Sequence, residues 1–395
     1  MTTMYMLDDT TALSAKIKVI GVGGGGGNAL NNMINQNLRG VEFIAANTDA
    51  QAVEQSRADI RIQLGTGLTR GLGAGANPQI GKEAADFERE HIREVLAGSD
   101  MAFITAGMGG GTGTGAAPIV AEVARELGVL TVAVVTKPFN FEGIRRMRQA
   151  EAGIAELRKH VDTLIIIPNQ KLISAVGKNT TMLEAFRKAD DVLLQAVRGI
   201  AELITHTGYM NVDFADVRSV MSETRGMAMM GSGSASGDNR AIEAAERAIS
   251  SPLLEDIDIH GAKAILVNVT GNEDMTMSEY DEAVSIIHNM ADEDANIICG
   301  MVYDKSVGEE MRVTVVATGL SCDVPAARLA AANSRVVETH PRTPAAVAHP
   351  HHHHATRPQT AIENKPAMQA QLFGAEGIYD DEAFAIPTFL RRQAD

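Results

Sequence analysis

Short, nearly uninterrupted runs of apolar residues alternate with longer amphipathic stretches through the first half of the chain. Such runs are typical of strands buried in a parallel sheet, and the stretches between them have the 3.6-residue period of helices. The predicted strands are Ile17–Val22, Val41–Ala46, Met101–Ala106, Leu130–Val135 and Thr163–Ile167. The alternation predicts an α/β fold with a doubly wound, mostly parallel sheet, in which ligands bind at the carboxyl ends of the strands.

Helical spacing of apolar residues from Leu183 to Ile204 predicts one long central helix. A smaller α/β domain with a mixed sheet follows, and Gly231–Asn239 is interpreted as a Gly/Ser-rich loop within it. After Gly319 the sequence becomes rich in Ala, Pro, Thr, Gln and His, which predicts disorder. The predicted divisions are a flexible N-terminus 1–14, a nucleotide domain 15–181, the central helix 182–207, a second domain 208–319, a disordered linker 320–378 and a C-terminal peptide 379–395.

Composition narrows the choice of partners. The net charge is −15, which argues against nonspecific binding of nucleic acid or of anionic membranes. No apolar run reaches the length of a membrane span, and residues 1–14 do not have the pattern of a signal peptide. The two cysteines, Cys299 and Cys322, lack metal-ligand spacing. We therefore expect a cytoplasmic protein that does not insert directly into a membrane.

The strongest chemical signal is the glycine run Gly107–Gly115, which follows a predicted strand and precedes a predicted helix with Pro118 in its first turn. Glycines let the backbone turn several N–H groups toward one point, where a helix N-terminus also favours an anion. The run therefore predicts a phosphate cradle, and Thr112 and Thr114 add hydroxyls. Its candidate binding residues are Gly110, Gly111, Thr112, Gly113, Thr114 and Gly115.

Two further glycine clusters precede predicted helices. The first has the spacing Gly21-x-Gly23-x-x-Gly26, with Asp49 at the distance expected of a ribose-binding acid, so a dinucleotide remains an alternative. The second runs from Gly65 to Gly75 and can equally be an ordinary turn between a strand and a helix. Three such loops together suit a triphosphate.

The second half contains a candidate pair of carboxylates. Asp213 and Asp216 bracket a predicted helix start, so they either cap that helix or orient a water molecule. Phe186 and Asp191, near the start of the central helix, either contact a base or serve the core and the helix N-terminus. The chain closes on Ile386-Pro387-Thr388-Phe389-Leu390-Arg391-Arg392, a compact apolar and basic motif of the kind that becomes ordered on binding a groove.

On these motifs the chain resembles the tubulin/FtsZ family of bacterial division GTPases over roughly residues 15–320 and 379–394. Gly109–Gly115 matches the signature of that family, Asn211–Val217 matches its synergy loop, and Ile386–Arg392 is similar to its partner-binding peptide. The resemblance implies GTP and GDP as ligands, with Mg²⁺, because the P-loop lysine motif is absent and metal and amides must balance the phosphate charge. It implies no direct protein ligand for a metal.

The resemblance also implies roles for individual residues. The nucleotide is contacted by Gly24, Gly25 and Asn28 of the glycine loop after the first strand. It is also contacted by Gly75 and Ala76 at the end of the Gly65–Gly75 cluster. Phe186, Asp191 and Asn169 hold the guanine, and Glu142 and Arg146 contact the ribose and the edge of the base. Asp213 and Asp216, supported by Asn211, enter the site of the next subunit in a head-to-tail homopolymer and position the attacking water. The peptide residues Ile386, Pro387, Phe389, Leu390, Arg391 and Arg392 bind membrane-tethering and regulatory division proteins at mid-cell.

Two features depart from the family pattern. Phe384-Ala385 stands where an acidic residue usually precedes the Ile-Pro pair, which bears on partner affinity. The histidines His349 and His351–His354 are interpreted as low complexity rather than as a metal site.

Two other functional classes remain open. The first is an NAD(P)-linked oxidoreductase, based on the Gly21–Gly26 fingerprint and Asp49. The second is a scaffold that binds GTP without hydrolysing it.

Overall fold

A computed structural model of the chain describes residues 15–176, 180–205, 212–222, 226–254, 261–292 and 294–319. The predictions for segment 1–14, for the linker 320–378 and for the peptide 379–395 lie outside these residues.

Six parallel strands form the first part of the sheet, in the order β3-β2-β1-β4-β5-β6. This is the doubly wound order, so the predicted fold class is confirmed. Its switch point lies between β1 and β4, which pair in register from Ile17–Met101 to Val22–Ala106. The strands are β1 Ile17–Val22, β2 Val41–Asn47, β3 Ile60–Gln63, β4 Met101–Gly107, β5 Leu130–Lys137 and β6 Thr163–Pro168.

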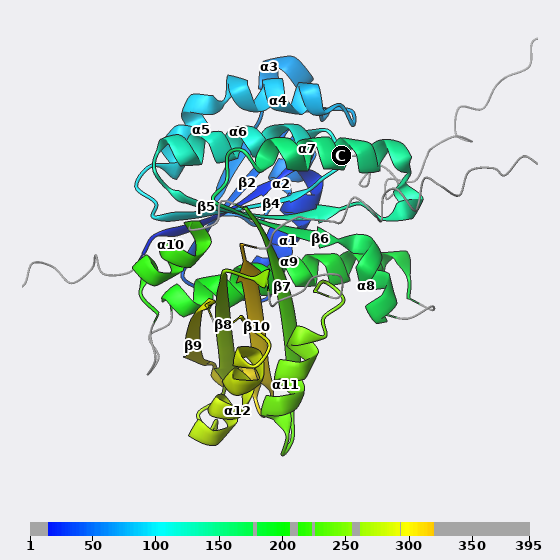
Figure 1. Cartoon of the computed structure of the whole chain (residues 1–395). Coiled ribbons are helices and arrows are strands. Elements are labelled where there is room, and N and C mark those ends of the chain that lie inside the picture. Colours follow the sequence, from blue (N-terminus) through cyan, green and yellow to red (C-terminus); the bar gives the residue numbers. More distant parts are fainter. Residues whose placement is uncertain are drawn as a thin grey trace, which may run out of the picture. The chain divides into compact units, whose positions relative to one another are not determined.

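Helices cover both faces of this sheet (Figure 1). One layer holds α4 to α7, where α6 packs on α4, α5 and α7; α1 and the long helix α9 pack together on the opposite face. The helical elements are α1 Gly23–Asn35, α2 Ala50–Glu54, α3 Thr66–Thr69, α4 Pro78–Phe87, α5 Arg89–Leu96, α6 Thr112–Glu126, η1 Asn140–Glu142, α7 Ile144–Leu157, α8 Asn169–Val176, α9 Met182–Thr205 and α10 Phe214–Ser222.

The second part continues the sheet through β7, which pairs parallel to β6 and antiparallel to β10. The order β7-β10-β8-β9 mixes antiparallel and parallel pairs, as predicted. The elements are β7 Gly226–Ala235, α11 Arg240–Ile249, β8 Ala264–Gly271, α12 Met277–His288, β9 Asn296–Tyr303, η3 Lys305–Val307 and β10 Met311–Thr318.

The predicted Gly/Ser loop at Gly231–Asn239 is wrong in its first half, because Gly231 to Ala235 belong to β7. A Cβ atom on Gly233 would lie 2.2 Å from the carbonyl oxygen of Ala244, and one on Gly231 only 2.0 Å from that of Ala248. These glycines therefore let α11 pack directly on the strand, a role that composition alone does not reveal.

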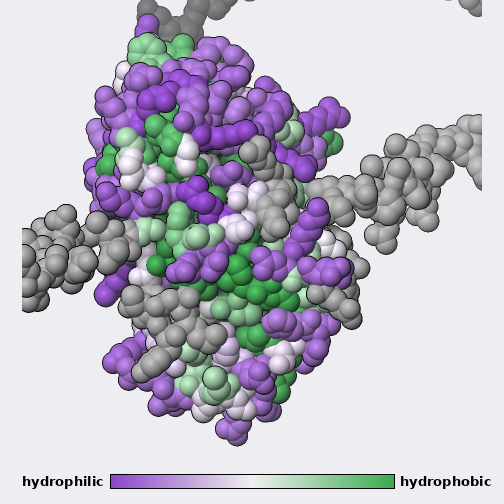
Figure 2. All heavy atoms as spheres, turned by 60° about the vertical axis from the view of Figure 1, so that its left-hand side comes forward, coloured by the Kyte–Doolittle hydropathy of each residue, from purple (hydrophilic) through white to green (hydrophobic). Residues whose placement is uncertain are grey.

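The long predicted helix is confirmed as α9, and its C-terminal half is largely buried. One hydrophobic cluster joins Leu30 of α1, Val197 of α9 and Leu266 of β8, so a single core extends from the first part of the sheet into the second. Separate clusters lie beneath α4 to α7 and beneath α11 and α12. On the surface in Figure 2, apolar residues gather in the lower part of the view, whereas the upper part is mainly hydrophilic.

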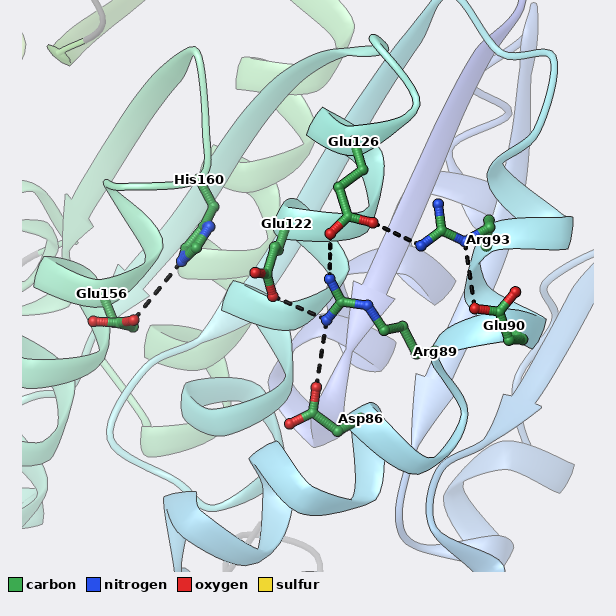
Figure 3. A network of polar contacts seen from close by, with 8 residues as sticks. All are labelled: Asp86, Arg89, Glu90, Arg93, Glu122, Glu126, Glu156 and His160. Atoms are coloured by element: carbon green, nitrogen blue, oxygen red, sulfur yellow. Dashed lines mark hydrogen bonds and ion pairs between the residues drawn. The ribbon is translucent and has the colours of Figure 1, made fainter.

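An ion-pair network fastens α4 and α5 to α6 (Figure 3). The guanidinium of Arg89 contacts Glu122 at 3.0 Å and Glu126 at 2.5 Å, and Arg93 contacts Glu126 at 2.6 Å. Hydrogen bonds from Arg93, and then from Arg89, lower the pKa of Glu126. The network braces α6, the helix that starts at the glycine run.

Candidate functional site

Two helix N-termini meet at the switch point of the sheet. Because β1 and β4 are neighbours in register, α1 begins at Gly23 beside the point where α6 begins at Thr112. A Cβ atom on Gly23 would lie 2.7 Å from the amide nitrogen of Gly113. Only glycine permits this approach. The glycine segments at Gly23–Gly27 and Gly107–Gly115 therefore form one cradle of backbone amides.

Parts of two glycine runs are helical rather than loops that precede helices. Gly23–Gly27 form the first turns of α1, and Gly113 and Gly115 lie within α6. Pro118 was predicted in the first turn, but α6 begins six residues earlier, at Thr112, so that prediction is wrong. Gly115 is needed here because a Cβ atom would lie 2.0 Å from the carbonyl oxygen of Pro78 in α4.

The turn before α6 is held by a hydrogen bond to Thr114, which lies in the first turn of that helix. The amide of Gly109, a residue with φ of +106°, donates to Oγ1 of Thr114 at 2.8 Å. Oγ1 of Thr112 lies 2.6 Å from Oγ1 of Thr48, and both threonines are buried. Thr48, which follows β2, was missed by the sequence reasoning because no local pattern marks it.

The third glycine cluster also reaches the cradle. Ala76 has a left-handed φ of +57°, an uncommon conformation for a residue with a side chain. A Cβ atom on Gly111 would lie 2.8 Å from Cβ of Ala74 and 3.0 Å from the amide nitrogen of Asn77. The segment Ala74–Asn77, which contains Gly75 and Ala76, therefore packs against the turn before α6. Strain of this kind is concentrated at functional sites.

Three phenylalanine rings form a cluster between the end of β5, η1 and α9. The ring of Phe139 stacks on Phe141 with centroids 5.0 Å apart and meets Phe186 edge-on at 5.2 Å. Phe139 is fully buried, whereas Phe186 is half-buried and keeps part of its ring accessible. Phe139 had no assigned role, and it supports Phe186.

The predicted base-binding polar residues Asn169 and Asp191 lie in α8 and α9. Oδ1 of Asp191 accepts a hydrogen bond of 3.0 Å from Asn32, which lies one helical turn beyond the exposed Asn28. Among the described residues, Oδ1 of Asn169 is one of few buried side-chain oxygens without a hydrogen-bond partner. A buried carbonyl oxygen of this kind is costly to leave unpaired, which is typical of a ligand-binding position. Burial, with a smaller contribution from Asp191, raises the pKa of Asp190 to about 7.

Glu142 and Arg146 form a pair at the edge of this group. Their closest side-chain atoms are 2.9 Å apart, and Oε1 of Glu142 also accepts from the amide of Phe139 at 2.8 Å. The pair is partly exposed and lies beside the cradle, since a Cβ atom on Gly109 would lie 2.9 Å from the carbonyl oxygen of Arg146.

Asp49 has a structural task that weakens the dinucleotide alternative. Its Oδ1 accepts from the amides of Gln51 at 2.9 Å and Ala52 at 3.3 Å, so it caps α2. One of its two carboxylate oxygens is therefore engaged as a helix cap, which is a structural explanation for an acid at this position.

Asp213 and Asp216 lie near the amino end of β4, at the end of the sheet opposite the cradle. Both are exposed at the start of α10, where Arg218 donates to the carbonyl oxygen of Asp100 at 3.5 Å. Asp100 immediately precedes β4, whereas the cradle follows its last residue, Gly107. At about 3.3 Å per residue, β4 alone separates these two ends by about 20 Å. The carboxylates therefore do not face the cradle of their own chain, and Asn211 lies outside the described residues.

The terminal peptide Ile386–Arg392 also lies outside the described residues. In the part of the chain that the structure does describe, no helix has both the length and the hydrophobicity of a membrane span.

Comparison with known proteins identifies two matching family models. Residues 16–177 match the GTPase domain of the Tubulin/FtsZ family, and residues 226–321 match the C-terminal domain of the FtsZ family.

Curated relatives match most or nearly all of the chain. Cell division protein FtsZ of Pseudomonas aeruginosa is 53% identical over 404 residues, which span 99% of this chain and 100% of that protein. Cell division protein FtsZ of Coxiella burnetii is 58% identical over 317 residues, covering 80% of this chain and 82% of that protein.

Solved structures agree with this assignment. The empty FtsZ dimer of M. jannaschii matches with a TM-score of 0.74 and 48% identity, covering 77% of this chain and 88% of that one. The GDP-bound CetZ1 monomer of Haloferax volcanii, at 18% identity and a TM-score of 0.67, shares the fold over 80% of this chain and 97% of its own. The chain therefore belongs to the FtsZ family of tubulin-like cell-division GTPases.

Proposed function

We propose that this chain binds GTP across its three glycine segments, assembles head to tail and hydrolyses GTP where two copies meet. The observation that carries the proposal is the separation of the two half-sites. The amide cradle lies at the carboxyl ends of β1 and β4, and Asp213 and Asp216 lie at the amino end of β4. A second copy stacked in the same orientation brings its carboxylates to the cradle of the first. Such a heterologous contact does not close on itself and generates filaments.

The cradle residues bind the phosphates. The starts of α1 and α6 lie side by side, and both helix dipoles favour an anion there. The residues in this role are Gly24, Gly25, Asn28, Gly75, Ala76, Gly110, Gly111, Thr112, Gly113, Thr114 and Gly115. Mg²⁺ suits this site, because hydroxyl, carbonyl and phosphate oxygens are the ligands it prefers, and it supplies the positive charge that the missing P-loop lysine would provide.

The group around Phe186 binds the base. The unpartnered Oδ1 of Asn169 and the carboxylate of Asp191 are acceptors, which match the N1 and N2 donors of guanine. The accessible ring of Phe186 offers a stacking surface. Glu142 and Arg146, as a partly exposed pair beside the cradle, contact the ribose and the edge of the base.

The carboxylates of the neighbouring copy act on water. Asp213 and Asp216, supported by Asn211, orient and polarise the water that attacks the γ-phosphate, so turnover depends on assembly. Through Ile386–Arg392 the chain also binds membrane-tethering and regulatory division proteins, which places it at mid-cell in the cytoplasm.

Dilution tests the assembly step. GTP turnover per molecule is expected to fall steeply as the protein is diluted, because the water-positioning carboxylates come from another copy. Phosphate release is measured over a hundredfold range of protein concentration, with light scattering in GTP, in GDP, and in GTP plus EDTA. A turnover per molecule that stays constant down to high dilution contradicts an intermolecular site.

Asp216→Ala tests the role of the carboxylate. We expect hydrolysis to fall by about 100-fold or more while GTP affinity stays within about twofold. Affinity is measured by equilibrium dialysis and turnover at saturating GTP. The matched control, Asp281→Ala, removes an exposed carboxylate from α12 and is expected to behave as the unaltered chain. A loss of GTP binding in Asp216→Ala contradicts the assigned role.

The two other classes are separated by simpler observations. Nucleotide extracted from the purified chain is guanine nucleotide for a GTPase and nicotinamide nucleotide for an oxidoreductase. A scaffold that only binds GTP releases no phosphate at any protein concentration.

A further inference from the structure

Arg198, on the last turns of α9, connects that helix to α1. Its Nη2 donates to the carbonyl oxygen of Gln36 at 2.9 Å, and Gln36 is the C-cap residue of α1. A guanidinium at this position satisfies a free helix carbonyl and complements the negative end of the helix dipole. Since α1 begins at Gly23 in the cradle, Arg198 reaches the far end of a phosphate-binding helix.

The same guanidinium pairs with Glu202, one turn further along α9. Nε of Arg198 lies 3.6 Å from Oε1 of Glu202, and the two side chains are only 18% and 9% exposed. The other charged groups that face Glu202 come from the second part of the sheet, Arg312 on β10 and Asp304 just after β9. The pair therefore lies where α1, α9 and the C-terminal strands meet.

This end of α9 is packed tightly on those strands. A Cβ atom on Gly199 would lie 2.7 Å from Thr314 of β10, and Nδ2 of Asn268 on β8 donates to the carbonyl oxygen of Gly199 at 3.0 Å. A Cβ atom on Gly300 of β9 would lie 2.2 Å from Leu203. Close packing thus fixes α9 against the C-terminal strands, while a hydrogen bond from Arg198 connects α9 to α1.

Seven residues separate Thr205, the last residue of α9, from Asp213. Leu203 of the last turn of α9 and Val212, the residue before Asp213, both lie against Gly300 of β9, since a Cβ atom there would lie 2.2 Å from Leu203 and 2.9 Å from Val212. A small change in the direction of the last turn of α9 therefore reaches the water-positioning segment through this shared contact. Displacements of about 1 Å in such geometry can lower turnover by about 100-fold without loss of binding.

We propose that Arg198 is a positioning residue for GTP hydrolysis. By bonding the end of α1 and pairing with Glu202, it fixes the last turn of α9 and so the entry into the segment of Asp213 and Asp216. The inference rests on the proposed function, because it assumes that this segment completes the site of a neighbouring copy.

Arg198→Gln and Arg198→Lys in the full chain test the proposal. For Arg198→Gln we expect GTP affinity within about twofold of the unaltered chain and turnover of assembled protein lowered by roughly tenfold. Arg198→Lys recovers part of the turnover, since an ammonium can reach either the carbonyl or the carboxylate but lacks the fork that reaches both.

The control is Arg247→Gln. Arg247 likewise pairs with a glutamate four residues away, Glu243, and bonds a backbone carbonyl, but it lies exposed on α11. Its removal is expected to leave turnover within about twofold. Affinity and turnover that fall together in Arg198→Gln overturn the proposal, as does unchanged turnover.

Glu202→Gln gives a second test that keeps the side-chain volume. Burial raises the pKa of Glu202 to about 7, against the opposing effects of Arg198 and Arg312, so its charge changes between pH 6 and pH 8. The unaltered chain and the variant are expected to turn over at similar rates at pH 6, where both groups are largely neutral. At pH 8 the unaltered chain is expected to be several-fold faster, because only then is Arg198 paired with a carboxylate.

The ratio of the turnover of the unaltered chain to that of Glu202→Gln separates the titration of Glu202 from that of other groups, because the other groups are present in both proteins. An equal ratio at both pH values overturns the proposal even if Arg198→Gln does not fold. If the proposed function itself is wrong, the outcome differs, because the turnover of the unaltered chain then does not depend on protein concentration.

Discussion

At the scale of single residues, burial decides the chemistry of two carboxylates on α9. The pKa of Asp190 and the pKa of Glu202 are each raised to about 7, and burial is the first cause for both. The sequence shows two ordinary acidic residues in an amphipathic helix. Their altered protonation depends on neighbours that only the fold brings together, such as Arg312 of β10 for Glu202.

Asp190→Asn is expected to stabilise the chain at alkaline pH. In the unfolded chain Asp190 titrates near its ordinary pKa of 3.8, and in the folded chain near 7. Between these values the folded state binds the extra proton, so stability falls as the pH rises from about 4 to 7, and the cost is complete above 7. Without the carboxylate, the free energy of unfolding at pH 8 should rise by about 1–3 kcal/mol.

Urea unfolding of the nucleotide-free chain at pH 5 and pH 8 measures this effect. The gain should be clearly larger at pH 8. Asp281→Asn, at an exposed position, should change stability little at either pH. A gain of equal size at both pH values would mean that the raised pKa is not its cause.

At the scale of elements, the lengths and types of the strands follow closely from the apolar runs. β1 has the predicted bounds, and the predicted strands corresponding to β2, β4, β5 and β6 begin at the observed residues. No predicted strand covers β3, and the other errors concern glycine. Sequence patterns indicate loops at Gly23–Gly27 and Gly231–Asn239, but the structure forms the start of α1 and the end of β7. In both places the missing Cβ atom is used for close packing, which depends on a partner element distant in sequence.

Gly233→Ala tests this interpretation. Alanine favours an extended strand over glycine, yet its Cβ atom would lie 2.2 Å from the carbonyl oxygen of Ala244 and 2.5 Å from the amide nitrogen of Ala248. We expect a loss of about 1–3 kcal/mol in the free energy of unfolding, because backbone atoms of α11 must move.

Gly67→Ala is the matched control, since nothing lies within 4 Å of the added atom on this α3 residue. It should be neutral or stabilising by up to about 1 kcal/mol. Both variants are compared by urea denaturation. Equal stability of Gly233→Ala and the unaltered chain would show that the strand and α11 can separate without cost.

At the scale of the whole molecule, the two half-sites lie at opposite ends of one sheet. The cradle and the carboxylates are joined by β4, by α9 and by the core that these elements share. Under the proposed function one copy carries half of each of two sites, so two differently impaired copies should complement each other.

Mixing two variants tests complementation. Asp216→Ala keeps its cradle, whereas Gly109→Ala strains the turn before α6, where φ is +106° and the added atom would lie 2.9 Å from the carbonyl oxygen of Arg146. Each alone should hydrolyse GTP slowly. An equal mixture should exceed the sum of the separate rates by about tenfold, because Gly109→Ala supplies intact carboxylates to the GTP bound by Asp216→Ala. A mixture that only adds the two rates would contradict a shared site.

The sequence by itself determined the fold class, five of the six parallel strands in the first part of the sheet and the positions of the glycine segments. These features depend on local periodicity and on backbone conformations that glycine alone adopts easily. The tertiary structure decided which groups meet, namely Thr48 with Thr112, Asn32 with Asp191, and Arg198 with the end of α1. It also placed Asp213 and Asp216 at the opposite end of the sheet from the cradle. Contacts between residues many positions apart arise only when the sheet and its helices pack, so no local pattern encodes them.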